Sequence, residues 1–334
     1  MMGGRRGLEL MASLGLGLIG LGRHGQRYAR HLLDRIPHCH LVAVCRRDTS
    51  RGQTFATQHG LRHYQDHHDL IADPDIQAII VVTPPGEAFP IALEAIRQKK
   101  PLLVEKPLAH TAFEAQQIVK AAAQAKSPVM VAQTLRYEET IVALKQHGSK
   151  IGQWQYIVLT NRLESALDPV HDLHSISNQG ALLEIGIHQL DLVRFLTGQE
   201  VQQVHCDMDR EDGQGHDTRA WVSLKTDGDI PCLLDISRQS KTKVTRAEII
   251  GKRGQLIADW TSNILTHIQE GEQRICQSFP STVTIPKVIA DFVNAVQNDR
   301  PMPITGLDGQ RAVEIADACY ESARTGKVIH LKQG

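Results

Sequence analysis

The chain of 334 residues has no excess of charge of either sign, since Lys+Arg and Asp+Glu each number 37. This balance gives no electrostatic reason to expect nucleic acid or an anionic membrane surface as a partner. The chain also lacks an uncharged apolar run near the roughly 20 residues that a membrane-spanning helix needs. We therefore expect neither a nucleic-acid partner nor a membrane partner.

The cysteine and histidine patterns of disulfide frameworks and metal sites are missing as well. The 6 cysteines show no CxxC spacing, which favours reduced thiols and a cytoplasmic location. The 17 histidines include His63, His67 and His68 in a polar stretch that we expect to form a loop. Because no HExxH or Cys/His ligand spacing occurs, we predict that the protein has no metal site.

A glycine-rich motif is the first feature that indicates a function. It consists of the residues Gly20-Leu21-Gly22-Arg23-His24-Gly25. An apolar stretch at 14–19 precedes it and a helical apolar pattern ending at Pro37 follows it, which is the context of a dinucleotide-binding fingerprint. In such a site Gly20 permits the turn, Gly22 admits the pyrophosphate, and Gly25 lets the helix pack on the strand. We predict that the N-terminal amides of this helix hold the phosphates.

The end of the second predicted strand favours NADP over NAD. Arg46 and Arg47 stand about 20 residues beyond Gly25, where NAD sites usually carry an acid that binds the ribose 2′-hydroxyl. A guanidinium pairs instead with a 2′-phosphate. We predict NADP(H) as the preferred cofactor and NAD(H) as the alternative, with Asp48 as the acid that would serve NAD.

Polar residues also follow later strands of the same domain. Strands and helices alternate to about residue 135, which predicts a doubly wound parallel sheet of the Rossmann type with its ligands at the carboxyl ends of the strands. The segments at these ends are Thr83-Pro84-Pro85, Glu105-Lys106-Pro107 and Gln133. We expect all three to line the cofactor site, with the Lys106 amine at its reactive end.

The pattern changes from Trp154 onward, where longer alternating strands are joined by Gly- and Asp-rich turns. We predict a mobile extension at 1–12, a Rossmann domain at 13–135 and an α+β domain at 136–334 that binds substrate. The second domain would be built on a mostly antiparallel, open-faced sheet, with C-terminal helices that can pack back on the first domain. Covering the open face predicts a homodimer or homotetramer.

One helical pattern of the second domain carries a candidate acid and base. Apolar residues between Leu183 and Val193 mark a helix face, and Gly198 makes a C-cap. Glu184 and His188 are four residues apart, which places them on one side of that helix one turn from each other. We expect them to face Lys106 of the first domain.

With these motifs the chain resembles the Gfo/Idh/MocA family of NAD(P)-dependent oxidoreductases, from residue 14 to the end. The resemblance rests on the glycine motif, Thr83-Pro84-Pro85, Glu105-Lys106-Pro107, Gly180 to Asp191 and Gly306 to Gly326. It implies that Lys106, Glu184 and His188 occupy the positions of the catalytic lysine, aspartate and histidine of the family. It also implies a dimeric or tetrameric assembly.

The chain departs from the pattern of the family at three places. Glu184 stands where an aspartate is usual, Ala88 where many members have a histidine, and Ser177-Asn178-Gln179-Gly180 replaces a glycine run. Two alternatives to hydride transfer stay open. The resemblance allows glycoside cleavage with a transiently reduced bound nicotinamide, as in some relatives, and the departures at Glu184 and Ala88 allow a nucleotide-binding sensor without catalysis.

The predicted reaction is hydride transfer at a carbinol or carbonyl carbon of a sugar, cyclitol or related polyol. We expect His188 to act as acid or base, Lys106 to hold the substrate oxygen, and Glu184 to orient His188 or the substrate. Four further residues are weaker candidates for substrate contacts: Arg136, Tyr137, His171 and His174.

Overall fold

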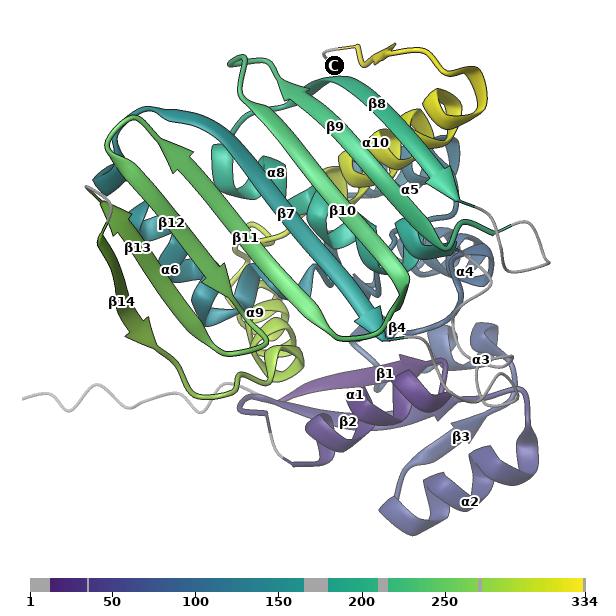
Figure 1. Ribbon diagram of the computed structural model, residues 1–334. Helices are drawn as coiled ribbons and strands as arrows, with labels where there is room; N and C mark the ends of the chain where they lie inside the picture. The colour runs from purple at the N-terminus through teal and green to yellow at the C-terminus, as the bar shows by residue number, and fades with distance from the viewer. Residues whose placement is uncertain (1–12, 35, 165–179, 210–215, 270–271, 333–334) are drawn as a thin grey trace, which may run out of the picture.

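The computed structural model describes residues 13–34, 36–164, 180–209, 216–269 and 272–332 (Figure 1). The extension predicted at 1–12 and the candidates His171 and His174 lie outside these residues. The described chain forms two sheets, the first from its N-terminal part and the second from its C-terminal part, and helices accompany each of them (Figure 1).

The first sheet is a parallel Rossmann sheet with the strand order β3-β2-β1-β4-β5-β6. Its central strands are apolar and buried along their whole length, as expected where helices cover both faces of a sheet. The strands are β1 (Leu14–Ile19), β2 (Cys39–Cys45), β3 (Arg62–Tyr64), β4 (Ala78–Val81), β5 (Leu102–Val104) and β6 (Val129–Val131). The helices are α1 (Arg23–Leu33), α2 (Thr49–His59), α3 (His67–Ala72), α4 (Pro85–Arg97) and α5 (Ala112–Ala125).

The second sheet has nine strands in the order β14-β13-β12-β11-β7-β10-β9-β8-β15. All neighbours are antiparallel except β7 and β10, so the predicted mostly antiparallel sheet is confirmed. The strands are β7 (Trp154–Glu164), β8 (Val201–Asp209), β9 (Arg219–Thr226), β10 (Pro231–Ser240), β11 (Val244–Gly251), β12 (Gly254–Asp259), β13 (Ile264–Gln269), β14 (Glu272–Ser278) and β15 (Ile329–His330).

Helices cover one face of this second sheet (Figure 1). They are α6 (Glu139–His147), α8 (Ile187–Thr197), α9 (Thr284–Gln297) and α10 (Gly306–Thr325), with the short segments η1 (Thr134–Tyr137), η2 (Gly148–Ile151) and η3 (Leu182–Gly186). Alternate residues of β7, β9 and β10 point to the opposite face, where Tyr156, Trp221 and Leu233 are 41%, 44% and 50% exposed. In the described part of the chain no helix lies over that face in Figure 1.

The two sheets are joined through the C-terminal helices. The amide of Val131 in β6 donates to Ile304 just before α10, and α10 also packs against α5. Helix α9 contacts α1 and η1. The boundary predicted between 135 and 136 falls inside η1. Among the described residues, no helix is both long and apolar enough to cross a membrane.

Candidate active site

The glycine loop between β1 and α1 leaves room for a phosphate group. Gly20 has a φ of +96°, and a Cβ there would lie 2.2 Å from the Val82 carbonyl oxygen. A Cβ at Gly25 would lie 1.8 Å from the Gly20 carbonyl oxygen, so helix and strand are in close contact. Around Gly22, in contrast, a Cβ would meet nothing within 4 Å. Helix α1 begins after Gly22 without a side-chain cap, so its first amides are available for an anion.

Unpaired buried polar atoms lie at the carboxyl ends of two other strands of the same sheet. The Thr83 hydroxyl, after β4, and Gln133 Nε2, after β6, are buried and have no hydrogen-bond partner in the described part of the chain. Pro84 and Pro85 then begin α4. Buried polar groups in native proteins are almost always paired. Together with the space at Gly22, these donors at the carboxyl edge of the sheet fit a bound dinucleotide.

The basic pair after β2 divides its contacts between the loop and solvent. Arg46 is 19% exposed and donates through Nη1 to the Leu21 carbonyl in the glycine loop. Arg47 is 83% exposed and pairs with Glu87 of α4 at 2.8 Å. The Asp48 carboxylate caps α2 by accepting from the Arg51 amide at 3.1 Å. This acid is therefore engaged with the helix that follows it.

Glu105 is a buried carboxylate that connects the glycine loop to Lys106. It is 8% exposed, and its Oε1 accepts from His24 Nε2 at 2.9 Å and from the Tyr28 hydroxyl, while Oε2 accepts from the Lys106 amide at 3.0 Å. Burial raises the pKa of this carboxyl. The hydrogen bond and charge of His24, the charge of Lys106 and the hydrogen bond of Tyr28 outweigh burial and lower the pKa to about 2. Glu105 is therefore ionised and rigidly held beneath the lysine.

Lys106 reaches across to the second domain. Its Nζ donates to the backbone carbonyl of Glu184 in η3 at 2.6 Å. Burial lowers the pKa of this amine, while the charges of Glu105 and Glu184 act in the opposite direction. The Glu184 carboxylate itself pairs with Arg238 of β10 at 2.7 Å. The partner of the Glu184 carboxylate is thus Arg238, whereas the four-residue spacing predicts His188 or the substrate.

The segment that carries Glu184 is a π-helical turn, which runs directly into α8. In a π-helix the hydrogen bonds join residues five apart, and such turns are frequent at functional sites. His188, in the first turn of α8, has its Nδ1 3.1 Å from Gln133 Oε1. Burial and the Lys106 charge lower the pKa of this imidazole to about 3, so it is uncharged at neutral pH.

The weaker candidates Arg136 and Tyr137 have structural partners instead of facing an open site. Arg136 makes a bidentate pair with Asp191 of α8 at 2.7 and 2.6 Å and also contacts Asp308 of α10 at 3.0 Å. The Tyr137 hydroxyl donates to Asp291 of α9 at 2.9 Å. These bonds tie η1 to three helices of the second domain, so we interpret both side chains as structural and withdraw the expected substrate contacts.

Three residues at the site were not predicted from the sequence. Tyr28 lies one turn beyond His24 on α1, and their rings meet edge to face at 5.5 Å, so helical spacing could have indicated it. Asp191 follows His188 by three residues on the same helix and could have been found in the same way. Arg238 lies on β10, distant in sequence from Glu184, and no local pattern marks it.

Two other features lie away from this edge. His63 lies in β3, and His67 and His68 begin α3, so the prediction of a loop at these residues is wrong. Among the described His, Cys, Asp and Glu side chains, Asp66, His67 and His68 form the sole group of three whose ligand atoms lie within 4.8 Å of one another.

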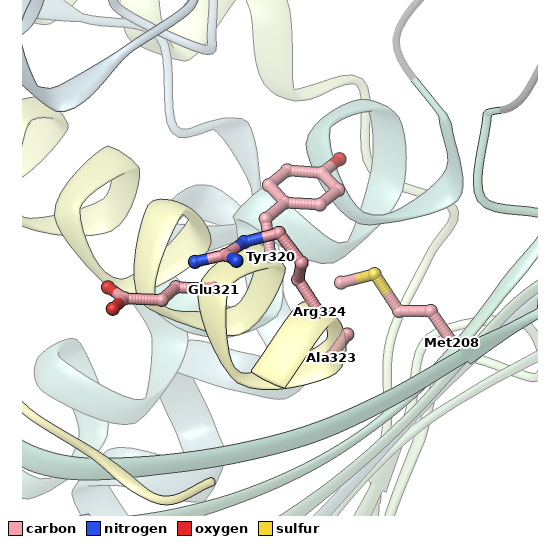
Figure 2. A pocket seen from close by; sticks show the side chains of 5 residues that line it. All are labelled: Met208, Tyr320, Glu321, Ala323 and Arg324. Atoms are coloured by element: carbon pink, nitrogen blue, oxygen red, sulfur yellow. The ribbon is translucent and has the colours of Figure 1, made fainter. Parts of the chain in front are cut away.

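A cavity of about 520 Å³ lies between β8 and α10 (Figure 2). Its lining residues are Met208, Tyr320, Glu321, Ala323 and Arg324.

Comparison with known proteins identifies the family of the chain. A family model described as an oxidoreductase family, NAD-binding Rossmann fold, matches residues 14–133, and the model of its C-terminal alpha/beta domain matches residues 177–331. Fold and fingerprint thus define an NAD(P)-dependent oxidoreductase. The chain belongs to the Gfo/Idh/MocA family.

Relatives cover nearly the whole chain. It is 29% identical to the inositol 2-dehydrogenase of Acidothermus cellulolyticus, over 95% of this chain and 94% of that protein. A solved structure of an Agrobacterium radiobacter oxidoreductase, in complex with NAD+, L-tartaric acid and magnesium, is similar with a TM-score of 0.85 at 21% identity and covers 96% of this chain and 98% of that one. The aldose-aldose oxidoreductase of Caulobacter crescentus has a TM-score of 0.84 at 20% identity, with 96% and 100% covered.

Proposed function

We propose that this protein transfers a hydride between NADP(H) and a carbinol or carbonyl carbon of a sugar, cyclitol or related polyol. The observation that carries the proposal is that Lys106 of the first domain bonds to the Glu184 carbonyl, four residues before His188, and lies close enough for its charge to lower the pKa of His188. The similarity to an inositol 2-dehydrogenase supports a polyol substrate. When bound, the nicotinamide supplies or accepts the hydride.

The side chains of this chain would handle the proton and the oxygen. Lys106 donates a charge-assisted hydrogen bond to the substrate oxygen and stabilises negative charge that develops there. His188, uncharged at neutral pH, accepts the hydroxyl proton during oxidation and returns it during reduction. Glu184 and Arg238 form the polar wall next to Lys106 and position the substrate.

The preference for NADP is supported by the residues after β2. The Arg46 guanidinium lies next to the glycine loop and that of Arg47 next to α4. Asp48, the acid that would serve NAD, caps α2. A 2′-phosphate would be attracted by the positive charge of Arg46 and Arg47, and Asp48 lies 3.9 Å from the Arg46 guanidinium. We therefore keep NADP(H) as the preferred cofactor.

We also propose that the chain assembles as a homodimer or homotetramer through the open face of the second sheet. Tyr156, Trp221 and Leu233 expose apolar surface there, and large exposed apolar surfaces commonly mark protein interfaces. Light scattering of the parent protein and of the variant Trp221→Glu/Leu233→Glu tests this. A monomeric parent, or an oligomer that the variant leaves intact, would contradict it.

The direct test of the reaction is a screen of sugars, cyclitols and their keto forms with NADPH, NADH and their oxidised forms. We expect steady cofactor turnover in proportion to product with at least one polyol, and its loss in Lys106→Ala. Release of an aglycone without net change of the cofactor would instead establish glycoside cleavage. Tight cofactor binding without any turnover would establish the sensor alternative.

A further inference from the structure

We propose that Gln133 is the positioning residue of the catalytic histidine: its side-chain carbonyl accepts the Nδ1 hydrogen of His188 and thereby fixes the lone pair on Nε2. The role in catalysis rests on the proposed function, whereas the tautomer itself does not. The evidence consists of the turn that holds Gln133, the bond that it makes, and the tie that fixes α8 beside it.

The backbone holds Gln133 in one place at the carboxyl end of β6. Its φ of −77° and ψ of 75° are those of the central residue of an inverse γ-turn, and the Thr134 amide donates to the Ala132 carbonyl at 2.9 Å across it. The side chain is 1% exposed, so it has little freedom to turn away. Strand β6 pairs with β5, which places Gln133 beside the segment that carries Lys106.

The bond to His188 determines which ring nitrogen carries the proton. Gln133 Oε1 lies 3.1 Å from Nδ1, and a carbonyl oxygen only accepts hydrogen bonds. We therefore assign the hydrogen to Nδ1, which leaves the lone pair of the neutral ring on Nε2, where a proton acceptor requires it. Nε2 of Gln133 makes no bond to the described part of the chain and can donate to a bound molecule.

A second tie keeps the histidine at this distance. Arg136, three residues after Gln133, makes its bidentate pair with Asp191, three residues after His188. Both connections, Gln133–His188 and Arg136–Asp191, therefore join the segment 133–136 to α8. The pair Arg136–Asp191 holds the helix, and the bond Gln133–His188 holds the ring.

The chemistry differs from that of a histidine oriented by a carboxylate. A carboxylate would stabilise the imidazolium form, whereas a neutral amide orients the ring without doing so. The charged or titratable groups around His188 from the other elements are Lys106, Glu105 and His24. Burial lowers the pKa of His188 most, Lys106 and His24 lower it further, and Glu105 acts in the opposite direction.

The test is the tautomer of His188, measured by NMR in the full-length protein with labelled ring nitrogens and assigned by comparison with His188→Gln. We expect a protonated Nδ1 and a bare Nε2 in the parent. In Gln133→Leu we expect this single tautomer to be lost. Gln189→Leu is the matched control, because Gln189 is the buried neighbour of His188 and its amide has no described partner. We expect the control to keep the tautomer of the parent.

Kinetics supply the second readout. In Gln133→Glu, which keeps the shape, the new carboxylate should raise the pKa of His188 by about one unit or more and move the acid limb of kcat/KM to higher pH. In Gln133→Leu we expect kcat to fall about 10²-fold. A bare Nδ1 in the parent, an unchanged tautomer in Gln133→Leu, or an unshifted pH profile in Gln133→Glu would each overturn the proposal. A parent without turnover would refute the proposed function and leave the tautomer test intact.

Discussion

Two carboxylates flank Lys106, and they are held in opposite ways. Glu105, in the Rossmann domain, is almost fully buried and accepts hydrogen bonds from His24, Tyr28 and the Lys106 amide. Glu184, in the second domain, is half-buried and pairs with Arg238. Glu105 lies buried beside the glycine loop, whereas the Glu184 side chain is partly exposed to solvent.

The difference indicates how the two domains divide the work. A buried carboxylate with several donors holds its surroundings in one arrangement, and removing it leaves those donors unsatisfied. A half-buried ion pair contributes less to stability and tolerates adjustment. We therefore expect changes on the Rossmann side to affect stability and cofactor binding, and changes on the Glu184 side to affect rate and substrate choice.

The largest effect should come from the groups between the two carboxylates. Lys106→Ala should lower the rate about 10²–10³-fold, because a preorganised donor to the developing charge is lost. His188→Ala should lower it about 10²–10⁴-fold through loss of the acid or base. Steady-state kinetics and cofactor titration measure both, and we expect cofactor affinity to change little. Lys120→Ala, on the exposed face of α5, is the control, and near-parent rates in both variants would show that the assignment is wrong.

Glu105→Gln should be the next most damaging change, and it should act on stability. The amide would direct hydrogens at existing donors, which we expect to destabilise the fold by on the order of 3 kcal/mol in denaturant melts. Glu139→Gln, at the exposed pair with Lys287, should change stability by less than about 1 kcal/mol. Equal effects of the two variants would break the comparison.

The same carboxylate predicts how stability depends on pH. The pKa of Glu105 is about 2 in the folded protein and lies near 4.3 in an unfolded chain. Between these values the unfolded state binds the additional proton, so stability falls as the pH falls through this window. Glu105→Gln should lose that part of the acid sensitivity, and a melt series with unchanged pH dependence would contradict it.

The basic pair after β2 tests the other end of the cofactor site. Arg46→Ala/Arg47→Ala should weaken NADPH binding by on the order of 2–3 kcal/mol, the scale of charged hydrogen bonds, and leave NADH binding little changed. Calorimetric titration with both cofactors measures this. If the parent protein bound NADPH and NADH equally well, the proposed preference would have to be abandoned.

Glu184→Asp should have the smallest effect, confined to the rate. Errors of 1 Å in an active site can lower rates by ~10²-fold, and we expect about tenfold here because the shorter side chain no longer reaches Arg238. Stability should stay near that of the parent, in contrast to Glu105→Gln. An unchanged or improved rate would show that the site has not adapted to glutamate.

Sequence reasoning reached the features that depend on local backbone chemistry. The roles of Gly20, Gly22 and Gly25 follow from spacing, and strand ends such as Lys106 follow from the alternation of strands and helices. It missed the pairs that join distant segments. Arg238 meets Glu184 only because β10 passes η3, and the π turn before α8 changes the spacing on which the pairing of Glu184 and His188 was based.

The central claim is that a hydride moves between substrate and nicotinamide, and isotope transfer tests it most directly. A polyol found active in the screen is deuterated at its carbinol carbon and incubated with NADP+ and the parent protein. We predict one deuterium on the reduced nicotinamide for each ketone formed, and no transfer in Lys106→Ala. Product formation with no deuterium left on the released cofactor would contradict the account.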